Sequence, residues 1–129
     1  MQIKPAYTDV LSDVAQFLQE RTALCLSKGM AEDRIVIDPG FGFGKTTEHN
    51  LTLLKNLSSL LKFNFPILAG LSRKASIGEL LSAPVENRLF GSLSAHVIAY
   101  LNGAHIIRTH DIQPTAQALK IAQAVNSQD

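Results

Sequence analysis

The sequence predicts an α/β protein in which parallel strands alternate with helices. Three apolar segments, residues 34–38, 66–71 and 104–109, are each followed by charged or hydroxylated side chains. In the first two, apolar residues run consecutively instead of alternating with polar ones, which is typical of parallel strands covered on both faces. Because parallel strands have their carboxyl ends at one edge, we expect the polar side chains to gather there.

Helices are predicted before and after each strand, in the order αβαβαβα. The first covers residues 8–28, where Val10, Val14 and Leu18 recur at helical spacing and Gly29 ends the pattern. The others are expected at 47–61 with Thr47 as cap, at 77–81, at 86–101 ended by Gly103, and at 111–125, where Asp111 is the N-cap before Pro114.

Length and composition favour a single domain over residues 1–129. The formal charge is +1 and 46% of the residues are hydrophobic, so we expect a soluble protein that does not bind nucleic acid. Neither a membrane span nor a signal peptide is recognised, and the single cysteine, Cys25, has no partner for a disulfide. These features predict a cytoplasmic location.

Three strands with helices on one face would make only part of a TIM (β/α)₈ barrel. A whole barrel needs eight strands and about 250 residues. The chain would then correspond to the last three units and the helix before them. One strand face would stay bare, and we expect a partner copy to cover it in a homo-oligomer, a dimer.

A glycine-rich loop follows the first strand. In residues 39–45, three glycines alternate with Phe41 and Phe43. The spacing does not satisfy the dinucleotide-binding or Walker A patterns, so nucleotide binding ranks last among the alternatives. The loop is either a flexible tight turn or a binding element whose two exposed phenylalanines pack against a flat apolar group.

Asp38 ends the first strand and shares a face with Val36. A carboxylate there needs a partner. One alternative is an amino-heterocycle that offers adjacent N–H donors; the other is that Asp38 caps the loop or pairs with Lys74.

Two sets of residues with matching strand parity are expected to line one pocket: Gly70, Ser72 and Lys74, and Arg108 with His110. Their cations suggest an anionic group in the ligand. Arg73 has the opposite parity, so it is expected to point outward, solvated or ion-paired.

No metal site is expected in this chain. The remaining histidines, His49, His96 and His105, lack metal-ligand spacing. A cluster of Asp38, His110 and Asp111 is the weak alternative.

Four segments resemble dihydropteroate synthase: 38–45 (DPGFGFGK), 70–74 (GLSRK), 88–92 (RLFGS) and 108–111 (RTHD). The resemblance spans the whole chain but only the carboxyl half of the family's barrel. It implies a transferase of folate biosynthesis that joins para-aminobenzoate to a pterin pyrophosphate and releases pyrophosphate. No covalent enzyme intermediate is implied.

The resemblance also implies roles for six side chains. Asp38, Lys74 and Arg108 would bind the pterin. Phe43, Ser72 and Lys74 would border para-aminobenzoate, where sulfonamide drugs bind. Arg108 and His110 would hold pyrophosphate.

The family's amino half carries further pterin-binding residues and loops with a diphosphate or magnesium contact. Magnesium is therefore expected for the full-length family enzyme but not from this chain, and the isolated chain is expected to be nearly inactive. The alternatives are a pterin-binding methyltransferase, which corrinoid dependence would reveal, and a non-catalytic half-barrel assembly module. The resemblance further suggests a homodimer through the late helices, whose small residues between 91 and 99 permit close packing.

Overall fold

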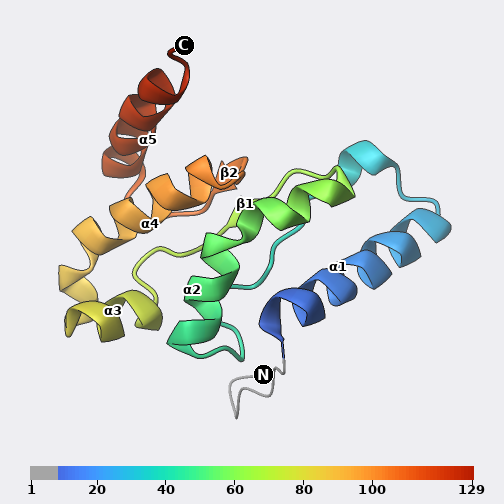
Figure 1. Ribbon diagram of the computed structural model, residues 1–129, viewed down its shortest axis with the longest axis horizontal. Helices are drawn as coiled ribbons and strands as arrows, with labels where there is room; N and C mark the ends of the chain where they lie inside the picture. The colour runs from blue at the N-terminus through green and yellow to red at the C-terminus, as the bar shows by residue number, and fades with distance from the viewer. Residues whose placement is uncertain (1–8) are drawn as a thin grey trace.

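The computed structural model describes residues 9–129, which form mostly helices around a small parallel sheet (Figure 1). Figure 1 places α1 and α5 at opposite ends of the molecule, with the strands between them. None of the helices described is long and apolar enough to cross a membrane. The elements, in chain order, are α1 (Val10–Ser27), η1 (Glu32–Arg34), α2 (Thr47–Lys55), η2 (Leu57–Phe63), β1 (Leu68–Ala69), α3 (Ala75–Leu81), η3 (Val85–Asn87), α4 (Leu89–Leu101), β2 (Ile106–Ile107) and α5 (Ile112–Asn126).

The sheet is parallel, as predicted, but its regular part is short. In the pairing of β1 with β2, Leu68 lies opposite Ile106. The first apolar segment adds a single parallel bridge, between Ile37 and Ile67, and the Ile37 N–H donates to the Pro66 carbonyl at 2.9 Å. Residues 34–38 therefore run beside β1 without forming a regular strand, so the third strand of the prediction is reduced to this bridge.

One face of the strands is buried and the other is open. Ile37, Ile67 and Ala69 are at most 2% exposed, whereas Val36 and Ile106 are 46% and 40% exposed. Neighbouring residues on a strand point to opposite faces, so the helices cover only one face of these strands. The buried face packs with apolar residues of the helices, among them Leu53, Leu57, Leu60, Ala95 and Ala99.

Several element ends differ from the sequence prediction. The N-cap of α2 is Thr46, not Thr47, because the Thr46 hydroxyl accepts the His49 N–H at 3.1 Å and the His49 ring accepts the Thr46 N–H. The helix expected at 47–61 is divided into α2 and η2 at Asn56. The helix expected from residue 86 starts at Leu89, after a separate 3₁₀ turn.

Candidate ligand-binding site

Glycine is required in the loop after the first apolar segment. Gly40, Gly42 and Gly44 have φ values of 76°, 88° and 64°, in the left-handed region that side chains disfavour. The Asp38 carboxylate accepts the Gly40 N–H at 2.9 Å. The Asn50 side-chain oxygen accepts the Gly42 N–H, also at 2.9 Å. The loop therefore has a defined conformation, held by the end of the first apolar segment on one side and by α2 on the other.

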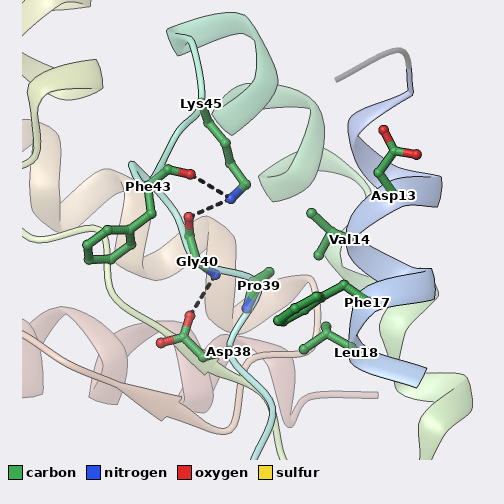
Figure 2. Close-up of a pocket in the computed structure, with 9 residues that line it drawn as sticks. All are labelled: Asp13, Val14, Phe17, Leu18, Asp38, Pro39, Gly40, Phe43 and Lys45. Atoms are coloured by element: carbon green, nitrogen blue, oxygen red, sulfur yellow. Dashed lines mark hydrogen bonds between the residues drawn. The ribbon is translucent and has the colours of Figure 1, made fainter. Parts of the chain in front are cut away.

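Lys45 stabilises the same loop from within. Its ammonium group donates to the carbonyls of Gly40 and Phe43, at 2.9 and 3.0 Å (Figure 2). Burial lowers the pKa of Lys45, and the charge of Asp38 opposes that shift. Lys45 is thus partly withdrawn from water to bond the loop backbone.

The two phenylalanines of the loop differ, which corrects the expectation that both are exposed. Phe41 is 1% exposed and belongs to the core, whereas Phe43 is 48% exposed. The Lys74 ammonium donates to the Phe41 carbonyl and lies 4.8 Å from the centroid of the Phe43 ring. Phe43 alone is therefore available to pack against a ligand, and Lys74 connects this loop to the next one.

The second loop, residues 72–74, is held by residues far along the chain. Arg73 has a φ of 55°, in the left-handed region. Its N–H donates to the Ser92 hydroxyl at 2.9 Å, and Arg88 Nη1 donates to its carbonyl at 3.0 Å. The Arg73 guanidinium pairs with Asp111, with Nε 3.0 Å from Oδ2. The outward, ion-paired position predicted for Arg73 is confirmed.

Asp111 precedes α5 as predicted, but its side chain does not cap that helix. The carboxylate turns to Arg73 instead. The hydrogen bonds from Arg73 hold the pKa of Asp111 below its usual value. Asp111 therefore stabilises the second loop and not the end of its own helix.

A cleft of about 280 Å³ lies between the second loop and the end of β2. The Arg108 guanidinium crosses Gly70, where an added Cβ would collide with it. Ser72 is 5% exposed, and its Oγ accepts the His110 backbone N–H at 3.1 Å and lies 2.9 Å from His110 Nδ1. The lining residues are Gly70, Ser72, Lys74, Arg108, Thr109 and His110, so the structure brings together the two sets that strand parity grouped.

Positive charge is concentrated at this cleft. The pKa of Lys74 is lowered, first by burial and next by the charge of Arg108, while Asp38 acts in the opposite direction. An ammonium that is both desolvated and beside another cation is stabilised when an anion arrives. The cleft is therefore suited to an anionic group.

Asp38 and Phe43 lie in an adjoining cavity of about 360 Å³, which α1 lines from its other side. Figure 2 shows the Asp38 carboxylate and the Phe43 ring on the side of the loop away from α1. The bond from Gly40 shows that Asp38 caps the loop through Oδ1. A carboxylate has two acceptor oxygens, so this bond is compatible with a contact to a ligand as well. The contact between Lys74 and Phe43 joins this cavity to the cationic cleft.

Within residues 9–129, no three His, Cys, Asp or Glu side chains come close enough to hold a metal ion. His49 caps α2, and the His105 ring accepts the Ile67 N–H at 3.1 Å.

The sequence did not indicate the roles of Arg88, Ser92 and Asn50, which hold the two loops in place. Arg88 and Ser92 belong to a segment, 88–92, that carried the family resemblance. That resemblance was the available signal, because helical periodicity says nothing about a contact with residues 15 to 19 positions away.

This geometry defines a class of protein: an α/β chain with a ligand site at the carboxyl ends of parallel strands, in the part of the fold where such proteins bind anions. The family model described as pterin binding enzyme matches residues 1–110. The chain belongs to that family.

The relatives are dihydropteroate synthases. The chain is 47% identical over 124 residues to that of Haemophilus influenzae, covering 96% of this chain and 45% of the relative. The Xanthomonas albilineans dihydropteroate synthase in complex with 7,8-dihydropteroate superposes with a TM-score of 0.96 at 44% identity, over 100% of this chain and 50% of that one. The structure of the same enzyme with 4-aminobenzoic acid superposes with a TM-score of 0.95 at 45% identity, over 97% of this chain and 46% of that one. The chain thus spans about half the length of the relatives it matches.

Proposed function

We propose that this chain provides the strand-end part of a dihydropteroate synthase site, which joins a pterin to para-aminobenzoate with release of pyrophosphate. The observation that carries the proposal is the cleft in which Lys74, Arg108 and His110 meet beside Phe43. Relatives with 7,8-dihydropteroate or 4-aminobenzoic acid support the two organic ligands. The proposal that the pterin carries a pyrophosphate group is supported by the positive charge of the cleft.

Each side chain has a role that fits its surroundings. Asp38 lies at an open position of the strand end, where its carboxylate accepts from the amino edge of the pterin. Arg108, flat over Gly70, offers a plane on which a pterin ring stacks. Phe43 provides an exposed ring beside para-aminobenzoate, next to Ser72 and Lys74.

The chemistry proposed for the site is electrostatic. When the bond between the pterin methylene carbon and the diphosphate oxygen breaks, its electron pair leaves with the oxygen and negative charge grows on pyrophosphate. Lys74, Arg108 and His110 stabilise that charge more than the ground state, which lowers the barrier. The amine of para-aminobenzoate then bonds to the methylene carbon and loses a proton. No residue of this chain forms a covalent bond with the substrate.

Calorimetry tests the proposal directly. Inorganic pyrophosphate is titrated into the 129-residue chain and into Arg108→Ala, with Arg34→Ala, an exposed arginine of η1, as the matched control. We expect Arg108→Ala to weaken binding by about tenfold or more, as for a lost charge-assisted hydrogen bond, and Arg34→Ala to bind as the parent does. Equal binding by all three chains would refute the anion site.

Turnover distinguishes the synthase from the alternatives. Formation of dihydropteroate from the pterin pyrophosphate and para-aminobenzoate is measured with the chain. Because the isolated chain is expected to be nearly inactive, ligand binding without product is the result expected of both the synthase half and a half-barrel assembly module. A residual rate of product formation would favour the synthase, and corrinoid-dependent methyl transfer would favour the methyltransferase. A cytoplasmic location and a homodimer remain part of the proposal, and sedimentation tests the latter.

A further inference from the structure

Three hydroxyl groups connect the cleft to the interface between α4 and α5. Ser72 Oγ lies 2.9 Å from His110 Nδ1, and Thr109 Oγ1 lies 3.5 Å from Ser72 Oγ. Thr115 Oγ1 is 3.1 Å from Thr109 Oγ1 and 3.2 Å from His96 Nδ1. This hydroxyl chain, Ser72, Thr109 and Thr115, therefore joins an imidazole at the cleft to an imidazole inside the molecule.

The inner end of the hydroxyl chain is closed. His96 is fully buried, and its Nε2 has no hydrogen-bond partner in the part of the chain that the structure describes. Burial lowers the pKa of His96, which favours the neutral ring with one proton. A buried N–H without an acceptor is rare and costly. The proton of His96 is therefore expected on Nδ1, where Thr115 accepts it.

That choice fixes the direction of every hydroxyl, because each has one hydrogen and two lone pairs. Thr115 accepts from His96 and so donates to Thr109. Thr109 also accepts the Asp111 N–H at 3.0 Å, so its own hydrogen points to Ser72. Ser72 accepts in addition the His110 N–H at 3.1 Å. Its hydrogen is then left for His110 Nδ1.

We propose that His96 is a positioning residue which, through the hydroxyl chain, keeps the proton of neutral His110 on Nε2. His110 Nδ1 is occupied as an acceptor, and Nε2–H remains as a donor. In the reverse arrangement His110 Nδ1–H donates to Ser72, all three hydroxyls turn round, and the proton of His96 moves to the buried Nε2. The two rings therefore hold opposite tautomers. Only the consequence for ligand binding rests on the proposed function, in which His110 meets pyrophosphate.

Nitrogen NMR of the 129-residue chain with ¹⁵N-labelled histidine measures both tautomers, at about pH 8, above the ordinary histidine range. We expect His96 to carry its proton on Nδ1 and His110 on Nε2. Thr115→Val removes the hydroxyl next to His96 while keeping the shape of the side chain. Without the Thr115 hydroxyl, no group donates to Thr109, so Thr109 can either donate to Ser72 or accept from it. His110 is then expected to become a mixture of its two tautomers.

The matched control is Thr22→Val, in which a buried threonine of α1 loses a hydroxyl bonded to the Leu18 carbonyl at 2.9 Å. It should leave both rings unchanged. Thr109→Val provides a second break in the hydroxyl chain and should mix the His110 tautomers in the same way. A His96 proton on Nε2, or His110 signals identical in the parent and both variants, would overturn the proposal.

Pyrophosphate titration separates this inference from the proposed function. Thr115→Val should weaken pyrophosphate binding by about two- to tenfold, the value of one hydrogen bond, and Thr22→Val should not. If pyrophosphate binds the parent and Thr115→Val equally, the positioning role is wrong. If the tautomers are as stated but the parent does not bind pyrophosphate, His96 still positions His110 and the synthase proposal fails.

Discussion

The two loops at the strand ends are held in opposite ways. Most bonds of the glycine loop, residues 38–45, come from nearby: those of Asp38, Lys45 and Asn50 span no more than eight positions, and the bond from Lys74 to the Phe41 carbonyl comes from farther along the chain. The second loop, residues 72–74, is bonded by groups 15 to 38 positions away, including Arg88 and Asp111. The first conformation is therefore encoded mainly by nearby residues, whereas the second forms only when α3, α4 and α5 are packed.

The loops meet at one side chain, Lys74. It bonds the Phe41 carbonyl and lies over the Phe43 ring, both in the glycine loop, while its own backbone belongs to the second loop. A change in either loop should therefore reach the cleft through Lys74. Variants that disturb one loop at a time test whether this dependence holds.

The largest effect is expected from removing the distant support of the second loop. Arg88→Met loses the bonds from Nη1 to the Arg73 carbonyl and from Nε to the Ala83 carbonyl, both 3.0 Å. We expect the free energy of unfolding to fall by about 2 to 3 kcal/mol, the range for a hydrogen-bonded charged group, measured by urea denaturation. Arg34→Met should change it by no more than about 0.5 kcal/mol. Similar midpoints for both variants would show that the second loop does not depend on α4.

A smaller effect is expected in the glycine loop. Gly42→Ala and Gly29→Ala both place a side chain at positive φ, 88° and 95°, so each should lose about 1 kcal/mol of unfolding free energy. The two sites differ in their surroundings: a Cβ at Gly42 would lie 3.2 Å from Lys74 Cδ, whereas Gly29 has nothing within 4 Å. Only Gly42→Ala should therefore also weaken pyrophosphate binding. If Gly42→Ala and Gly29→Ala bind pyrophosphate with equal affinity, the position of Lys74 at the cleft does not depend on the glycine loop.

The same division decides what the sequence could predict. Helix positions and the parallel direction of the apolar segments follow from local patterns, and Gly29 and Gly103 end their helices as expected, with φ of 95° and 110°. The extent of strand pairing could not be predicted from local patterns, because it depends on neighbouring segments. Residues 34–38 run beside the segment of β1 and form a single bridge with it. Thr46 rather than Thr47 is the cap because the reciprocal bond comes from His49, a detail that apolar spacing does not contain.

The sequence predicted part of the candidate site, but strand parity, the reason for the prediction, applies only to some of its residues. Strand parity grouped Ser72 with Lys74, yet the chain has left β1 by then and Arg73 adopts a left-handed conformation. The grouping survives because Arg88 and Ser92 bend the loop back over the cleft. Phe41 was misassigned because alternation with glycine cannot tell which phenylalanine meets the core. The role of His96, the buried imidazole bonded to the inner end of the hydroxyl chain, carried no sequence signal.

Phe43→Ala tests what the glycine loop contributes beyond its backbone. Loss of the exposed ring should weaken 4-aminobenzoic acid binding by about three- to tenfold, as expected for one aromatic contact, with little change for a pterin. Phe90→Ala, which removes an even more exposed phenylalanine in α4, is the control and should affect neither ligand. Calorimetry with both ligands measures this. Equal losses for the two ligands would contradict the assignment of Phe43 to the aminobenzoate side.

The smallest effect is expected from the ion pair that holds the second loop, in Asp111→Asn. Because Arg73 lowers the pKa of Asp111 in the folded chain, the carboxylate stabilises the fold at pH values above its unfolded pKa of about 3.9 and loses that contribution as the pH falls through the folded value. The urea midpoint of Asp111→Asn should therefore lie slightly below that of the parent at neutral pH and converge with it below about pH 4. Asp33→Asn, at an exposed position of η1, is the matched control variant. A gap between Asp111→Asn and the parent that stays constant into acid would mean that Asp111 acts through its shape, and that the second loop is held by Arg88 and Ser92 without help from this ion pair.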